Sequence, residues 1–154
     1  MKKILLSQNK YSIVDDEDFD LLNQFKWSVM NVGYAIRQDL NTKKFILMHR
    51  HILNAPDKFL VDHINGDKLD NRKENLRLCT KSQNMMNRDK TINNTSGFKG
   101  VYFRKDTKKW GAQIKLNYKN ISLGSYNTKE DAVKAHKNGL VKYHKEFARL
   151  NKIE

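Results

Sequence analysis

Short stretches of alternating hydrophobic and polar residues open the chain, a pattern typical of β-strands, whose successive side chains point to opposite faces. The first predicted strand is Tyr11–Val14. An acidic stretch follows, in which Asp15 or Asp16 is suited to cap a short helix that runs through Leu21 and Leu22. The N-terminal segment is therefore expected to contain a strand and then a helix.

Two groups of alternating residues predict further strands: Phe25, Trp27 and Val29, and then Tyr34 and Ile36. We interpret these aromatic side chains as core residues. A short helix is expected over Leu47–Leu53, and it should end near Pro56, because proline disfavours helical geometry in the residue before it. His49 and His51 fall on different faces of that helix, so packing is favoured for them over a shared metal site.

Residues 59–88 predict a strand, a turn, a second strand and a helix. Phe59–Val61 is an apolar strand, and Asn65–Asp67 is a strong turn signal because Asn and Gly tolerate positive φ. The second strand covers Leu76–Cys79. Thr80 stands three residues before Gln83, a capping-box pattern that opens a helix reaching about residue 88.

The polar stretch 91–96 has few residues able to build a core and is predicted to be a linker. Beyond it, alternation predicts three strands, Phe98–Arg104, Trp110–Leu116 and Lys119–Ser125. A second capping box, Thr128 with Asp131, predicts a final helix. We therefore expect an α+β chain: one domain at 1–90, and a second at 97–154 in which a three-stranded antiparallel sheet packs on one helix.

The chain of 154 residues carries a formal net charge of +13, which is unevenly distributed. Residues 1–90 hold 16 basic and 12 acidic residues, a net of +4, whereas residues 91–154 hold 14 and 5, a net of +9. This basic excess favours nucleic acid as the partner, with a solubilising surface as the alternative.

The cysteine content and the apolar runs of the sequence indicate where in the cell the protein is expected. Cys79 is the single cysteine, so the chain can form neither an internal disulfide nor a cysteine zinc cluster. The apolar run Ile4–Leu6 is too short for a signal peptide, and no later run could span a membrane. We expect a soluble cytoplasmic protein, and the sequence indicates no membrane and no protein partner.

The chemically informative segment is 61–84. Hydrolysis of a phosphodiester needs an activated water, for which histidine is suited because its ordinary pKa is about 6.5. It also needs the phosphate charge stabilised, for which a hard divalent cation with oxygen ligands is suited. His63 offers the imidazole, Asp62 a carboxylate and Asn84 an amide oxygen. Because strand neighbours point to opposite faces, Asp62 and His63 can serve one site only if the strand ends or distorts there, or if the phosphate lies between them.

This segment resembles the HNH endonucleases with the ββα-metal fold, and in particular the phage and intron-encoded homing endonucleases. The likeness covers about residues 1–88. It is carried by Asp62-His63, the phrase Glu74–Arg77 and Asn84, together with Leu47–Arg50 and Leu69–Arg72.

The resemblance implies a role for each matching residue. His63 would be the general base, Asp62 and Asn84 the metal ligands, and Asn75 a residue that holds the loop by backbone hydrogen bonds. It implies a single divalent cation, Mg²⁺ with Mn²⁺ as the alternative, and 5′-phosphate products. Structural zinc is not expected, because the paired cysteines of the zinc-bearing members are missing.

The C-terminal segment resembles the APETALA2/ethylene-response-factor DNA-binding domain, which also accompanies HNH nucleases in phages. The likeness is carried by Phe98–Val101, the Trp110 strand and Leu123–Thr128, and Ser122 stands where plant members usually have Trp. Basic groups interleaved with aromatics suit a sheet that enters a DNA groove. The residues predicted to contact DNA are Lys99, Tyr102, Arg104, Lys108, Trp110 and Lys115, with Arg72 and Arg77. Core packing is the alternative for Trp110, and solvation is the alternative for Arg72, Arg77, Arg104 and Lys115.

These patterns predict a metal-dependent endonuclease of the homing type that cuts duplex DNA. One alternative is a sequence-specific DNA-binding regulator with an inactive nuclease fold, and a weaker one is an RNA-directed nuclease. The first is favoured because Asp62, His63 and Asn84 occur together, whereas a regulator has no need of that trio.

Overall fold

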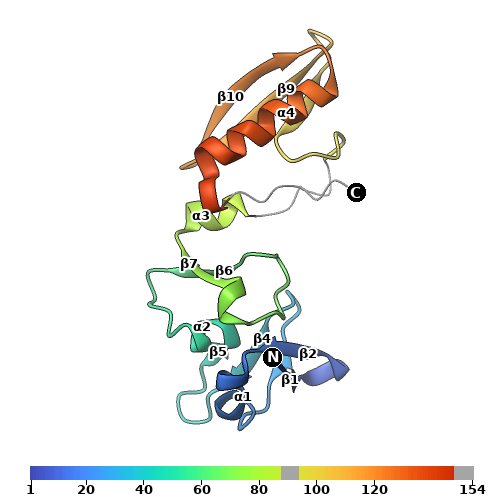
Figure 1. Ribbon diagram of the computed structural model, residues 1–154. Coiled ribbons are helices and arrows are strands. Elements are labelled where there is room, and N and C mark those ends of the chain that lie inside the picture. The colour runs from blue at the N-terminus through green and yellow to red at the C-terminus, as the bar shows by residue number, and fades with distance from the viewer. Residues whose placement is uncertain (88–93, 148–154) are drawn as a thin grey trace. The chain divides into compact units, whose positions relative to one another are not determined.

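The computed structural model describes residues 1–87 and 94–147, and short groups of strands are each followed by a helix along them (Figure 1). The chain divides into two units, Met1–Thr80 and Lys81–Glu154, each described here by itself. Residues 91–93 of the predicted linker and the expected helix end at Arg88 lie outside the described residues. The expected α+β class is confirmed.

The first unit starts with a hairpin. Strands β1 (Lys2–Leu5) and β2 (Tyr11–Val14) pair antiparallel, and α1 (Asp16–Leu22) follows. The sequence pattern predicted β2 and α1 but not β1. Asp15 is the residue before α1, yet its carboxylate accepts a hydrogen bond from the Lys73 backbone N–H (2.8 Å) instead of capping the helix.

A small sheet completes the core of this unit. Strands β3 (Ser28–Val29), β4 (Ala35–Gln38) and β5 (Phe45–Leu47) are antiparallel, and α2 (Met48–Ile52) follows directly. The strand predicted from Phe25 is shorter than expected, because the Phe25 N–H still bonds the Leu22 carbonyl at the end of α1 (3.2 Å). The core is formed by buried side chains of these elements and of residues next to them: Ile4, Leu6, Val14, Leu22, Trp27, Ala35 and Met48.

A second hairpin carries the segment singled out from the sequence. Strands β6 (Leu60–His63) and β7 (Leu76–Cys79) pair antiparallel, with Asp62 opposite Arg77. The connecting loop, 64–75, turns at Gly66, whose φ of +80° suits a residue without a Cβ. Further on, the loop docks on β2, since the Ile13 N–H donates to the Leu69 carbonyl (2.9 Å) and the Ile13 carbonyl accepts from the Asn71 N–H (2.8 Å).

The second unit contains α3 (Lys81–Met86) and the three predicted strands, β8 (Val101–Arg104), β9 (Lys109–Leu116) and β10 (Lys119–Tyr126), in the order β10-β9-β8. Helix α4 (Lys129–Gly139) packs on one face of this sheet, as Figure 1 shows. The predicted cap is present, because Thr128 Oγ1 accepts from the Asp131 N–H (3.2 Å). A π-helical turn, Leu140–His144, and a 3₁₀ turn, Lys145–Phe147, extend α4. None of the described helices has the length and apolarity needed to cross a membrane.

Candidate active site

His63 is the last residue of β6, and its side chain is buried at 5% exposure. Its Nε2 lies 3.1 Å from Asn71 Oδ1 in the loop that follows. The Asn71 Nδ2 in turn donates to Ser12 Oγ on β2 (2.7 Å). The imidazole is therefore held by a side chain that is itself anchored to the N-terminal hairpin.

An aromatic cluster encloses the other side of His63. The ring of His49, from α2, lies edge-on to it with a centroid distance of 5.1 Å, and Tyr34 lies 5.9 Å away. Burial lowers the pKa of His63 from its ordinary value, whereas its hydrogen bond to Asn71 Oδ1 and the nearby carboxylates, Asp62 first among them, oppose that shift. Burial, with the charges of His63 and Arg50, lowers the pKa of His49 to about 3. Both imidazoles are therefore neutral near pH 7, as a general base must be before it acts.

Asp62 is buried at 6% exposure and faces Arg77 across the hairpin. Its Oδ2 accepts from both Nε (2.9 Å) and Nη2 (2.7 Å) of that guanidinium. A buried carboxylate needs such compensation, because an isolated charge in the interior is strongly destabilising. Arg77, predicted to contact DNA, is thus engaged with the proposed metal ligand.

The second proposed ligand, Asn84, is half-buried in α3. Asp62 belongs to the first unit and Asn84 to the second, so neither unit by itself holds both oxygen donors. Carboxylate and amide oxygens are nevertheless the donor type that fits Mg²⁺, which binds through few protein ligands and keeps several waters. In the part of the chain that the structure describes, no three His, Cys, Asp or Glu side chains group as a metal site. Burial raises the pKa of the Cys79 thiol to about 11, which disfavours the thiolate that zinc would require.

Asn75, at the end of the loop, uses its side chain on backbone groups. Its Oδ1 accepts from the Asn65 N–H (2.9 Å), and its Nδ2 donates to the Asp70 carbonyl (2.7 Å). The Asn65 side chain also donates to the Asp70 carboxylate (2.8 Å). These bonds tie the two ends of the loop together beside His63.

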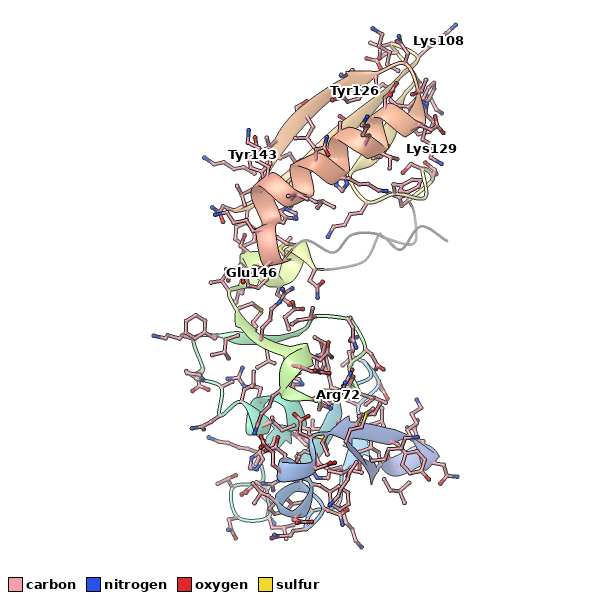
Figure 2. The ribbon with its side chains drawn as sticks, viewed as in Figure 1. Arg72, Lys108, Tyr126, Lys129, Tyr143 and Glu146 are labelled. Atoms are coloured by element: carbon pink, nitrogen blue, oxygen red, sulfur yellow. The ribbon has the colours of Figure 1, made fainter. Side chains whose placement is uncertain are left out.

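Arg72 lies in the same loop (Figure 2). Its guanidinium pairs with Asp70 through two bonds of 2.8 and 2.7 Å and also contacts Glu74. The pairing holds the pKa of Asp70 below its usual range. Like Arg77, this predicted DNA contact is engaged by carboxylates of its own chain.

The residues predicted to bind DNA in the second unit divide between the two faces of its sheet. Val101 faces α4, so Tyr102 and Arg104, which alternate with it along β8, lie on the opposite face of the sheet. Their partners on β9 lie on the same side as Lys115, so these three residues share the face away from α4. Trp110 lies on the other face, where it packs against Phe103 (centroids 5.2 Å apart) and the core formed with α4.

The remaining two lysines of that prediction lie outside the strands. Lys99 donates to the backbone carbonyls of Met85 (3.1 Å) and Met86 (2.9 Å) at the end of α3. Lys108 is exposed in the turn between β8 and β9, and Figure 2 shows its side chain directed away from the sheet. Only the turn and the face opposite α4 therefore present these basic groups to solvent.

From the sequence, Ser12 and Asn71 had no predicted role and His49 was expected only to pack, whereas the structure places all three around His63. Asn71 lies in Leu69–Arg72, one of the phrases that carry the family resemblance, and this could have marked it as a candidate site residue. Ser12 is 59 positions from Asn71, and only the docking of the loop on β2 brings them together.

The chain is similar to known proteins over the segment that contains this hairpin. Residues 47–86 match a family model described as HNH endonuclease, a span that contains α2, β6, β7 and α3. An uncharacterised HNH endonuclease of Acanthamoeba polyphaga mimivirus is 27% identical over 158 residues, which cover 97% of this chain and 80% of that protein. Protein 3.8 of Escherichia phage T7 is 31% identical over 70 residues, which cover 46% of this chain and 58% of that protein. No solved structure matches the chain.

The hairpin and its matching segment thus define the class: residues 47–86 are an HNH endonuclease domain. The protein that carries this domain is an HNH-type endonuclease, an enzyme that hydrolyses phosphodiester bonds. HNH endonucleases generally use a divalent metal.

Proposed function

We propose that this protein is a metal-dependent DNA endonuclease of the homing type, with His63 as the general base acting on duplex DNA. The observation that carries the proposal is the placement of His63: a buried imidazole at the end of β6, inside the HNH domain and oriented through Nε2 by Asn71. An imidazole held in this way can take a proton from a water aligned with the phosphate. The basic balance of the chain supports nucleic acid as the substrate.

Asp62 and Asn84 would hold the cation, with Mg²⁺ as the preferred ion because both donors are oxygens. When bound, such a cation neutralises phosphate charge and stabilises the departing 3′ oxygen. Asp62 also contributes to keeping the pKa of His63 from falling further. Arg77 compensates the charge of the Asp62 carboxylate from the opposite strand.

For the second unit, we propose DNA binding through the sheet face opposite α4, as the likeness to APETALA2-type domains implies. Tyr102, Arg104 and Lys115 share that face, and Lys108 extends it at the turn. Phosphate contacts of this kind fix the position of a protein on the duplex. In this arrangement the HNH segment, 47–86, cuts, and the sheet of the second unit increases the time spent on DNA.

The test is the conversion of supercoiled plasmid to nicked or linear forms with Mg²⁺, with and without chelator. We expect cleavage by the parent to require the cation, and His63→Ala to lower the single-turnover rate by about 10²–10⁴-fold while plasmid binding is retained. His51→Gln is the matched control, because His51 packs on Phe25 rather than on His63. Equal cutting by the parent and His63→Ala would refute the assignment, and binding without any cutting would favour the regulator.

A further inference from the structure

Three buried polar side chains form a continuous line from β2 to the proposed general base. Ser12 and Asn71 are both 0% exposed, and His63 is 5% exposed. The line runs from Ser12 Oγ to Asn71 Nδ2 (2.7 Å), and then from Asn71 Oδ1 to His63 Nε2 (3.1 Å). Ser12 and Asn71 are fully shielded from solvent, so their side chains must find hydrogen-bond partners within the protein.

The donor and acceptor roles in this line are determined at Ser12, the end farthest from His63. The Leu69 carbonyl can only accept, so the Ser12 hydroxyl donates to it (3.0 Å). The other neighbour of that hydroxyl, the Met48 thioether sulfur (3.2 Å), is also an acceptor. Ser12 Oγ therefore has only its lone pairs to offer Asn71, which must present its Nδ2 donor there.

The orientation of the Asn71 amide in turn determines which nitrogen of the His63 imidazole carries the proton. With Nδ2 directed at Ser12, the Asn71 Oδ1 faces His63, and an amide oxygen can only accept. His63 Nε2 must therefore carry a proton. In a neutral imidazole the lone pair is then on Nδ1.

We propose that Ser12 and Asn71 are positioning residues that fix His63 as the Nε2–H tautomer, so that Nδ1 is the atom that takes the proton from water. This inference rests on the proposed function of His63 as general base. Ser12 lies on β2, outside the segment 47–86 that matches the HNH family model. The N-terminal hairpin is thus part of the catalytic apparatus and not a separate accessory.

The backbone supports this role for β2. The hydrogen bonds of Ile13 with Leu69 and Asn71 flank the side-chain line and hold the loop against the strand. The Leu69 carbonyl accepts from both the Ile13 N–H (2.9 Å) and the Ser12 hydroxyl (3.0 Å), which uses both of its lone pairs. The anchor of the line is therefore rigid and cannot reverse its polarity.

The experiment reads the tautomer directly. Imidazole ¹⁵N shifts are recorded on the full chain, without metal or DNA, at a mildly alkaline pH, and His63 is assigned from the signal missing in His63→Gln. We expect a protonated Nε2 in the parent. Ser12→Ala frees the amide to turn, so a substantial Nδ1–H population should appear, and Asn71→Leu should also lose the single tautomer. Ser12→Thr, which keeps the hydroxyl, should restore it.

Cleavage supplies the second readout. Ser12→Ala and Asn71→Leu should lower kcat by about 10–100-fold with little change in KM, the range typical when the partner that orients a functional histidine is removed. Ser7→Ala is the matched control. It removes a hydrogen bond to the Val29 N–H (3.0 Å) in the same N-terminal segment, but Ser7 does not belong to the line to His63. It should leave the tautomer and kcat unchanged.

The two readouts separate the failure of each proposal. A tautomer that depends on Ser12 and Asn71 supports the hydrogen-bond line even if plasmid is not cut, in which case only the nuclease proposal fails. The proposed control of the tautomer by Ser12 and Asn71 is wrong if His63 in the parent is protonated on Nδ1. It is also wrong if folded Ser12→Ala and Asn71→Leu both keep the Nε2–H tautomer unchanged. A changed tautomer with unchanged kcat overturns the positioning role.

Discussion

The imidazole of His49 meets that of His63 edge to face, with ring planes at 87° and centroids 5.1 Å apart. Tyr34 contacts both rings, at 5.1 Å from His49 and 5.9 Å from His63. His49 is buried, and its Nδ1 has no hydrogen-bond partner among the described residues. With a pKa of about 3 it stays neutral, so it acts as an apolar wall that keeps His63 in position.

Replacing His49 tests whether shape alone matters at this contact. His49→Phe keeps an aromatic edge and removes the unpaired nitrogen, so we expect cleavage within a few-fold of the parent. His49→Ala leaves a cavity beside His63, and we expect a loss of about 2 kcal/mol in unfolding free energy and at least tenfold slower cleavage. Urea denaturation and single-turnover assays measure these effects. If His49→Phe is as inactive as His63→Ala, the wall interpretation fails.

The sequence pattern predicted individual helices and strands, but it did not predict the contacts between them. Strands β2, β6 and β7 and helices α1 and α2 were predicted because alternation and end signals are local properties. The contacts of His49 with His63 and of Ser12 with Asn71 join separate elements. Nothing in residue spacing records which elements become neighbours, so these contacts required the packed structure.

In the second unit the limits of prediction were different. All three strands and the capped helix were predicted, yet Trp110 and Lys115 were assigned to one surface. They are five positions apart on one strand, and an odd separation places them on opposite faces. The structure shows Trp110 on the face that packs on α4. Counting along the strand was sufficient to separate the two residues.

The ion pair between Asp62 and Arg77 predicts a change in metal affinity. Nε and Nη2 of the guanidinium both donate to Asp62 Oδ2, so Arg77 competes with a cation for that oxygen. Arg77→Met removes the compensation of a buried carboxylate, and we expect the half-saturating Mn²⁺ or Mg²⁺ concentration to fall several-fold. Arg72→Met is the control, because Arg72 pairs with Asp70 and Glu74. A higher half-saturating concentration would show instead that Arg77 is needed to hold Asp62 as a ligand.

The sheet face opposite α4 predicts which basic residues bind DNA. Arg104→Ala and Lys115→Ala should each weaken duplex binding. Each should also reduce the slope of log affinity against log salt by about 0.9 per lost phosphate contact. Lys134→Ala, on the exposed surface of α4, removes the same charge from the other side and should leave the slope nearly unchanged. Equal effects from all three substitutions would attribute binding to net charge and not to this face.

The buried histidine of α4 predicts how stability depends on pH. His136 is 5% exposed and lies against Gly100, where a Cβ would be 2.4 Å from its Nε2. Burial lowers its pKa to about 4, and neighbouring His144 and Lys99 disfavour the charged form further. Between pH 6.5 and 4 the unfolded chain therefore binds more protons at this position than the folded chain. Stability should fall as the pH drops through that window.

His136→Gln separates this contribution from those of the other histidines, which both proteins share. Between about pH 7.5 and pH 5, the parent should lose on the order of 1–2 kcal/mol more unfolding free energy than the variant. Urea denaturation followed by tryptophan fluorescence measures the difference, since Trp110 packs against the core that α4 covers. A buried neutral imidazole must gain a proton on unfolding in acid. The curves of unfolding free energy against pH for the parent and for His136→Gln should therefore converge as the pH falls. Parallel curves would mean that His136 is charged, or already hydrated, in the folded protein.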